Sequence, residues 1–127
     1  MSLGRFHAPR PADRSKLYNL SAGRIYVCDR GPVDAPILVL LHGLLVHHYE
    51  YSRLIPLLEE NFRVIAPDLM GCGNSDHPEG DLCEDYRLAF QARVILELFE
   101  VLQVGSSAPI HLVGHSMGGA VAGLVAL

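Results

Sequence analysis

The sequence predicts an α/β fold in which a mostly parallel sheet is flanked by helices. Apolar runs of strand length alternate with helix-length segments, and glycine-rich turns separate them. The strand candidates are apolar throughout, which is typical of strands that are covered on both faces. At 127 residues the chain fits a single domain, large enough to bury roughly two-thirds of its unfolded surface.

The amino-terminal segment, residues 1–21, is expected to be an extended or partly disordered leader. It is rich in proline, arginine and polar residues, and it contains no apolar stretch of the kind found in secretory signals. Residues 22–127 are assigned to the folded domain. The domain begins with residues 23–29, where Ile25 and Val27 alternate with more polar neighbours and predict an outer strand.

Residues 35–41 and 62–66 are near-continuous apolar runs and predict two buried strands. Between them, residues 50–60 predict a helix whose start is limited by Pro56. This helix would present three leucines on one face, namely Leu54, Leu57 and Leu58.

The most regular helical pattern spans residues 83–104. Its apolar residues recur at spacings of three and four and form one stripe, which we assign to packing against the sheet. The stripe consists of Leu88, Ala92, Ile95, Phe99 and Leu102. Gly105 follows directly and is placed to end the helix.

A third apolar run, residues 109–113, is followed by the segment Gly114-His115-Ser116-Met117-Gly118 and then by a helix-like run, residues 119–127. A strand, a sharp turn and a helix in this order hold a catalytic serine at the apex of the turn. The strained turn needs small residues on both sides of the apex, and glycine supplies them. Because the first amides of a helix lack partners, the Met117 N–H can face a developing oxyanion. The alternative is a serine that caps an ordinary helix.

Three signatures therefore occur in order: a strand ending in His42 and Gly43, a strand ending in Asp68 and a glycine-rich turn, and the serine turn. Together they resemble the α/β-hydrolase family, from about residue 23 to the last residue. The resemblance implies that Ser116 is the nucleophile and that the backbone N–H groups of Leu44 and Met117 form the oxyanion hole. It also implies a small-molecule acyl substrate and an acyl-enzyme intermediate, without a cofactor.

The resemblance assigns structural roles to several other polar residues. His42 would hold the loop that carries Leu44, and the His115 side chain would point away from the nucleophile. The loop 68–75 would be a structural turn in which Asp68 and Ser75 bond nearby amides and the glycines adopt positive φ.

In this family the acid and the histidine of the catalytic triad follow the serine, but only residues 117–127 do so here. We therefore expect the chain to lack the carboxyl-terminal strands and cap of the fold and to be inactive alone. It could be the amino-terminal part of a larger hydrolase, one half of an enzyme completed by a second chain, or a non-catalytic binding or assembly module with the same fold. A makeshift base among His47, His48 and His77 is a further alternative.

Without a following strand, residues 110–113 would form an exposed apolar edge. Such an edge pairs readily with another chain, so we expect self-association or a complementing carboxyl-terminal half.

Composition excludes several classes of protein. A net charge of −4 with no basic cluster argues against nucleic-acid binding, and no apolar stretch is long enough to span a membrane. The three cysteines are odd in number and widely spaced, which favours free thiols and a cytoplasmic location. Cys72, His77 and Cys83 match no zinc-ligand spacing, so no metal site is predicted.

Overall fold

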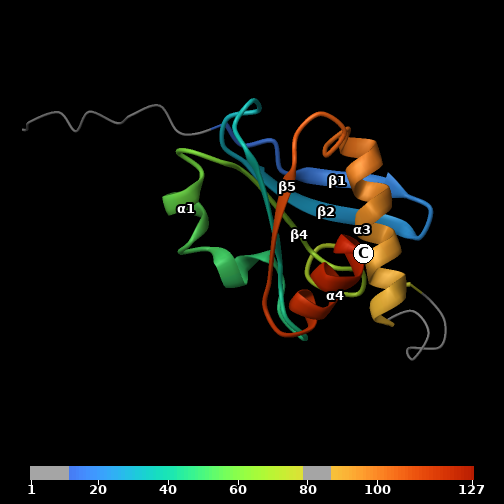
Figure 1. The fold of residues 1–127 in the computed structure, drawn as a ribbon. Helices are drawn as coiled ribbons and strands as arrows, with labels where there is room; N and C mark the ends of the chain where they lie inside the picture. Colours follow the sequence, from blue (N-terminus) through green and yellow to red (C-terminus); the bar gives the residue numbers. More distant parts are fainter. Residues whose placement is uncertain (1–11, 79–86) are drawn as a thin grey trace, which may run out of the picture.

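In a computed structural model of the protein, which describes residues 12–78 and 87–127, five strands form one sheet in the order β1-β2-β4-β3-β5 (Figure 1). They are β1 (Lys16–Leu20), β2 (Gly23–Arg30), β3 (Ile37–Leu41), β4 (Arg63–Pro67) and β5 (Ile110–Gly114). β3 pairs in parallel with β4 and β5, whereas β2 pairs antiparallel with β1 and β4. Only β2 therefore runs against the other strands, and the predicted α/β class is confirmed.

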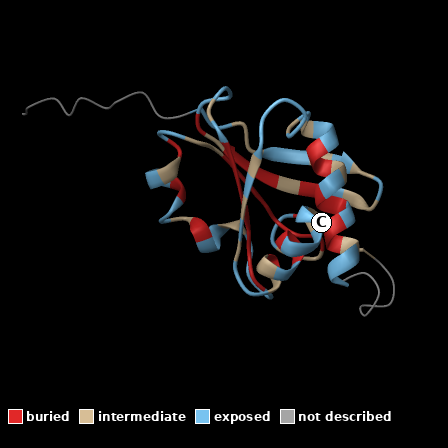
Figure 2. Cartoon of the chain, in the orientation of Figure 1, coloured by how far each residue is buried: buried red, intermediate tan, exposed pale blue. Residues whose placement is uncertain are grey.

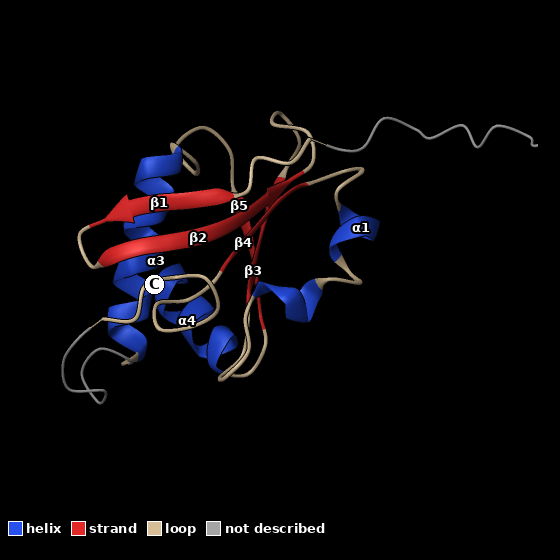
Figure 3. Cartoon of the chain, turned by 180° about the vertical axis from the view of Figure 1, so that it is seen from behind, coloured by secondary structure: helices blue, strands red, loops and turns tan. Residues whose placement is uncertain are grey.

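Helical segments cover both faces of the sheet (Figures 1 and 3). On one face lie α3 (Leu88–Leu102) and α4 (Met117–Ala126), which also contact each other. On the other face lie the short 3-10 helix η1 (His48–Tyr51) and the single turn α1 (Ile55–Leu58). None of the described helices is long and apolar enough to cross a lipid bilayer.

The core is divided between these two faces, and β3 contributes to both. Ile37, Val39 and Leu41 belong to the larger core, which α3 and α4 cover, while Leu38 and Leu40 belong to the smaller core beneath η1 and α1. This division follows from the two-residue period of a strand. All five side chains are buried, and Figure 2 shows buried residues concentrated in the central strands.

Strand β1 corrects the predicted leader, because residues 16–20 are part of the sheet. Lys16 pairs with Val27 and Leu20 with Gly23, so β1 rather than β2 is the outer strand. The β1 side chains are exposed or half-buried, which left only a weak apolar pattern in the sequence. Residues 1–11 lie outside the described residues.

The helix predicted over residues 50–60 is also corrected, because the segment contains the end of η1, a turn and α1. Pro56 has no N–H to donate to the carbonyl of Ser52, so a continuous helix cannot form there. The apolar face differs as well: Tyr51 and Ile55 are buried, whereas Leu57 is 73% exposed.

The long helix, α3, is shorter than predicted, and the predicted residues 83–86 lie outside the described residues. Of the expected stripe, Ala92, Ile95 and Phe99 are buried, while Leu88 is exposed. The helix ends at Leu102 and is capped by Gln103, which adopts a left-handed conformation with φ 56°, instead of by Gly105.

A buried carboxylate joins the antiparallel part of the sheet. Asp29 of β2 is 1% exposed and accepts hydrogen bonds from Arg63 Nε and Nη2 at 3.1 and 2.7 Å and from Arg14 Nη2 at 3.0 Å. Burial alone would raise the pKa of Asp29, but these guanidinium groups lower it below its ordinary value. Asp29 therefore remains ionised and links β2, β4 and the segment that leads into β1.

Candidate active site

Ser116 lies at the apex of the turn between β5 and α4, as predicted. β5 ends at Gly114, α4 begins at Met117, and Ser116 has φ 54° and ψ −118°, a conformation that non-glycine residues rarely adopt. The preceding N–H, that of His115, donates to Leu41 O at 3.0 Å and holds the turn against the end of β3. The Ser116 side chain is exposed, so its hydroxyl is open to a reactant.

The glycines two residues either side of Ser116 are required by close backbone contacts. A Cβ on Gly114 would lie 2.3 Å from Gly118 O, and a Cβ on Gly118 would lie 2.1 Å from Leu41 O. Both distances are far shorter than van der Waals contact. The predicted need for small residues at these two positions is confirmed.

The loop after β3 and the serine turn after β5 begin at paired positions. Leu41 and Gly114, the last residues of their strands, lie opposite each other in the parallel ladder. Leu44 and Met117 each follow three residues later. Both loops therefore leave the sheet side by side at the carboxyl ends of its strands, where open α/β sheets bind ligands.

Leu44 and Met117 line one pocket of about 480 Å³. Among the described residues, no protein group accepts a hydrogen bond from the backbone N–H of Leu44 or Met117. The pocket is mostly apolar, and Ser116 does not line it but directly precedes Met117. Its lining residues are Leu44, Leu45, Val46, His47, Gly71, Cys72, Gly73 and Met117.

His42 is fully buried and holds the loop that leads to Leu44. Its Nε2 accepts the Leu69 N–H at 2.9 Å, so its Nδ1 carries the proton and donates to Gly43 O at 2.8 Å. That carbonyl and the Leu44 N–H belong to the same planar peptide and point in opposite directions. Burial lowers the pKa of His42 and keeps the ring neutral. These contacts match the structural role that the resemblance implied.

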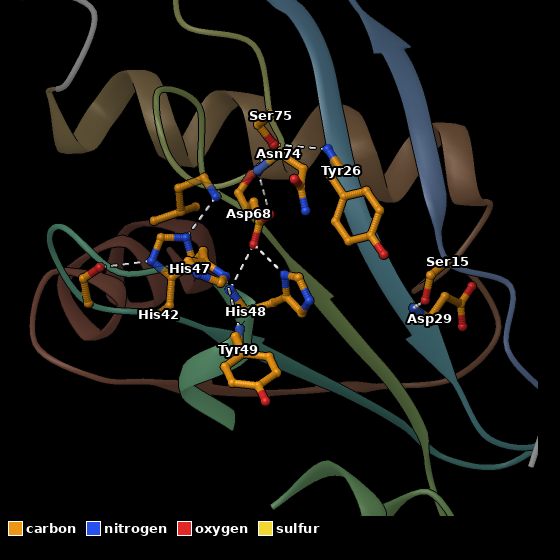
Figure 4. Close-up of polar contacts among 12 residues, drawn as sticks. Ser15, Tyr26, Asp29, His42, His47, His48, Tyr49, Asp68, Asn74 and Ser75 are labelled. Carbon is orange, nitrogen blue, oxygen red and sulfur yellow. Dashed lines mark hydrogen bonds and ion pairs between the residues drawn. The ribbon is translucent and has the colours of Figure 1, made fainter. Parts of the chain in front are cut away.

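Asp68 organises the glycine-rich loop after β4 (Figure 4). Its Oδ1 accepts the backbone N–H and the ring Nδ1–H of His48, both at 2.7 Å, and its Oδ2 accepts the Asn74 N–H at 2.9 Å. Ser75 donates its hydroxyl to Asp68 O at 2.6 Å and accepts the Tyr26 N–H at 2.9 Å. Burial would raise the pKa of Asp68, but the hydrogen bonds from His48 and Asn74 lower it.

Two glycines in this loop have the positive φ that was predicted, with values of 82° at Gly71 and 52° at Gly73. A Cβ on Gly73 would lie 2.3 Å from Asp68 Oδ2, so a side chain there would displace the carboxylate. The loop is therefore a structural turn, and it forms one wall of the pocket.

His47, His48 and Asp68 form a cluster with metal-ligand chemistry that the sequence did not reveal, because Asp68 is distant from the histidines along the chain. Their ligand atoms lie within 4.8 Å of one another. However, 2.7 Å between His48 Nδ1 and Asp68 Oδ1 is a hydrogen-bond distance. Neighbouring ligands around a tetrahedral zinc ion lie roughly 3.3 Å apart. The cluster is accounted for by hydrogen bonding, and Cys83 of the other candidate trio lies outside the described residues.

The three histidines considered as a makeshift base are placed differently. His48 is bonded to Asp68, His47 lines the pocket, and His77 is exposed. Among the hydrogen bonds of the described residues, none joins the Ser116 hydroxyl to a histidine. Among the described residues, the serine turn thus combines an exposed hydroxyl with two backbone N–H groups that have no acceptor, and no histidine is hydrogen-bonded to that hydroxyl.

Comparison with known proteins gives matches that cover most of this chain. The family model for the alpha/beta hydrolase fold matches residues 36–127. The chain is 38% identical over 103 residues to the magnesium-chelatase 30 kDa subunit of Rhodobacter capsulatus. This match covers 80% of this chain and 34% of that protein. The chain is also 40% identical over 82 residues to a haloalkane dehalogenase of Mycolicibacterium paratuberculosis, and this second match covers 64% of this chain and 27% of that protein.

Solved structures are similar in fold as well as in sequence. A structure from a set of novel epoxide hydrolases, found in metagenomes from hot environments, matches with a TM-score of 0.80 and 34% identity. The match covers 91% of this chain and 37% of that one. The chain therefore spans about a third of the length of the proteins that it matches.

Proposed function

Because the chain belongs to the α/β-hydrolase fold family, we propose that it carries the nucleophile and the oxyanion hole of a serine hydrolase. The observation that carries this proposal is the strained, exposed Ser116 beside the N–H groups of Leu44 and Met117, for which the described part of the chain holds no acceptor. A strained backbone conformation costs folding free energy, and such strain clusters at functional sites, so it supports a functional role for the Ser116 hydroxyl.

In the proposed reaction, the Ser116 hydroxyl attacks an acyl carbon and loses its proton to a general base. The negative charge moves to the carbonyl oxygen, which accepts hydrogen bonds from the N–H groups of Leu44 and Met117. The tetrahedral intermediate expels the leaving group, which takes up the proton, and Ser116 keeps the acyl group as an ester. Water then attacks this ester, releases the acid and restores the hydroxyl.

A serine at this position favours acyl substrates over the alkyl halides or epoxides named for two of the similar proteins. Attack of a hydroxyl on a saturated carbon would leave an ether, which water does not cleave under mild conditions. Attack on an acyl carbon leaves an ester, which water hydrolyses. The mostly apolar pocket supports a small-molecule substrate with an apolar group next to its carbonyl. The proposed reaction itself requires no cofactor.

The general base and its acid are proposed to come from residues that are not part of this chain. The chain spans about a third of its relatives, and no described histidine is bonded to Ser116. We therefore expect little or no turnover from the chain alone. A carboxyl-terminal segment that supplies both groups would restore it.

A serine-directed fluorophosphonate tests this proposal, because it labels only an activated serine. The chain is treated alone and after co-expression with a carboxyl-terminal fragment that carries the further strands of the family's sheet. We expect labelling of the complemented protein, loss of that labelling in Ser116→Ala, and wild-type labelling in Ser106→Ala, which changes an exposed loop serine. Equal labelling of Ser116→Ala, or no labelling of a folded complemented protein, contradicts the proposal and favours a non-catalytic module.

The exposed edge of the sheet supports assembly with another polypeptide. β5 is an outer strand, and only its Ile110 and Leu112 side chains pack against the larger core, while Val113 is 42% exposed. A free apolar edge of this kind adds strands from other chains. We propose that β5 pairs with a complementing segment, or with a second copy when that segment is absent.

Val113→Lys is expected to lower self-association of the isolated chain, because a lysine on an edge strand opposes strand addition. Sedimentation velocity over a range of concentrations measures the effect, and Val33→Lys, at a turn residue that is 59% exposed, is the matched control. A wild-type chain that stays monomeric throughout, or an equal effect of both lysines, contradicts the role of the β5 edge.

Two described cysteines support a reducing location. Cys28 and Cys72 are free, and burial raises the pKa of both thiols, which keeps them protonated and slow to oxidise. We infer from these free thiols that the protein functions in the cytoplasm.

A further inference from the structure

Glu50 in η1 joins the loop after β3 to the serine turn through a single carboxylate. Its Oε2 accepts the Gly43 N–H at 3.0 Å, and its Oε1 contacts the ring Nδ1 of His115. Gly43 directly precedes Leu44, and His115 directly precedes Ser116. We infer that Glu50 is a positioning residue, which sets the Leu44 N–H relative to the Ser116 hydroxyl.

The loop that carries Leu44 has few contacts of its own. The Leu44 and Leu45 side chains are 61% and 90% exposed, and Leu45 has a positive φ of 62°. Packing therefore contributes little to the orientation of the Leu44 peptide. The hydrogen bonds at Gly43 must therefore fix the orientation of the Leu44 peptide.

The two peptides that flank the Gly43 Cα are each held by a different side chain. Glu50 accepts the N–H of the peptide before it, and His42 donates to the carbonyl of the peptide after it. With both peptides held, the φ and ψ angles of a glycine that is otherwise free to rotate are fixed. The Leu44 N–H then points in one direction only.

The other arm of Glu50 holds the His115 ring over Gly43. A Cβ on Gly43 would lie 3.0 Å from His115 Nδ1, so the absence of a side chain at position 43 makes room for the ring. The Glu50 side chain is 22% exposed, whereas the His115 ring is 65% exposed. In this bridge between the loop after β3 and the serine turn, the Glu50 carboxylate is thus the less exposed partner and the His115 ring the more exposed one.

This inference rests on the proposed function for its catalytic meaning, but its structural part can be measured without catalysis. Amide hydrogen exchange and ¹⁵N relaxation of Gly43, Leu44 and His115 report on the loop directly. In Glu50→Ala we expect exchange at Gly43 to become about tenfold faster or more, because a charge-assisted hydrogen bond is lost. Glu50→Gln keeps an acceptor for the Gly43 N–H and should recover much of the protection. Glu60→Ala, at an exposed residue nearby in the chain, should exchange as the wild type does.

The complemented enzyme gives the second readout, with a p-nitrophenyl ester as the substrate. A misdirected oxyanion donor should lower kcat about tenfold in Glu50→Ala with little change in KM, and Glu50→Gln should recover most of the loss. Equal Gly43 exchange in Glu50→Ala and Glu60→Ala overturns the inference, as does faster exchange with an unchanged kcat. If exchange at Gly43 is faster in Glu50→Ala but the complemented protein is inactive with every variant, the proposed hydrolysis is contradicted instead. Glu50 is then confirmed as a residue that holds the loop, without a catalytic role.

Discussion

Gly118→Ala is expected to destabilise the fold by more than about 3 kcal/mol, or to prevent folding, because the new Cβ meets backbone that cannot move away. It would lie 2.1 Å from Leu41 O and 2.5 Å from His42 O. Leu41 is the last residue of β3 and His42 directly follows it, and Leu41 O also accepts the His115 N–H that holds the serine turn. To relieve the clash, α4 would have to move away from the sheet, and this movement would disrupt the candidate site.

Gly123→Ala provides the matched control, because Gly123 lies in the same helix and a Cβ there meets nothing within 4 Å. Alanine is a better helix former than glycine, so this variant should be about 0.5–1 kcal/mol more stable than the wild type. Urea denaturation followed by circular dichroism measures both changes. Wild-type stability of Gly118→Ala would show that the contact between α4 and β3 is looser than described.

Asp29→Ala is expected to cost about 3–5 kcal/mol of folding free energy, because it leaves the Arg63 guanidinium buried without its partner. Arg63 contacts Asp29 through two nitrogens, and its side chain is only 11% exposed. Asp34→Ala removes the same charge from an exposed turn and should change stability by less than about 0.5 kcal/mol. Urea denaturation of the two variants under the same conditions measures the change in the free energy of unfolding. Equal effects would mean that net charge, rather than the buried pairing, accounts for the loss.

The lowered pKa of Asp29 also predicts how stability changes with pH. A carboxylate whose pKa is lower in the folded state than the ordinary value of 3.8 stabilises the fold fully above that value. The stabilisation is lost as the pH falls through the folded pKa, because the group must then be protonated. Asp68 acts in the same direction. Stability should therefore fall from about pH 4 downward, and the decline should be shallower in Asp29→Asn.

Features with local determinants could be predicted from the sequence. The serine turn depends on glycines two residues either side of Ser116, and the buried strands depend on unbroken apolar runs. β1 was missed because its contacts are with β2 and its own side chains are mostly exposed, so the apolar pattern is weak. The segment 50–60 was misjudged because its leucine spacing suggested a helix, whereas Pro56 interrupts the hydrogen bonding that a helix needs.

Contacts between distant segments could not be predicted from the pattern of residues. Glu50 lies near Gly43 in the chain, but His115 reaches it only because β3 and β5 are neighbours in the sheet. The same adjacency brings Leu44 and Met117 to one pocket. The resemblance to a family supplied that pair, while the Glu50 bridge needed the three-dimensional arrangement.

The pairing of Leu41 with Gly114 means that the ladder of the sheet places the loops that carry the Leu44 and Met117 N–H groups side by side, independently of which side chains occur at positions 44 and 117. Evolution could then exchange the pocket-lining side chains, and so admit different molecules, while the donors stay in place. Substrate preference would then diverge faster than the placement of the two loops, since the first resides in replaceable side chains and the second in strand pairing.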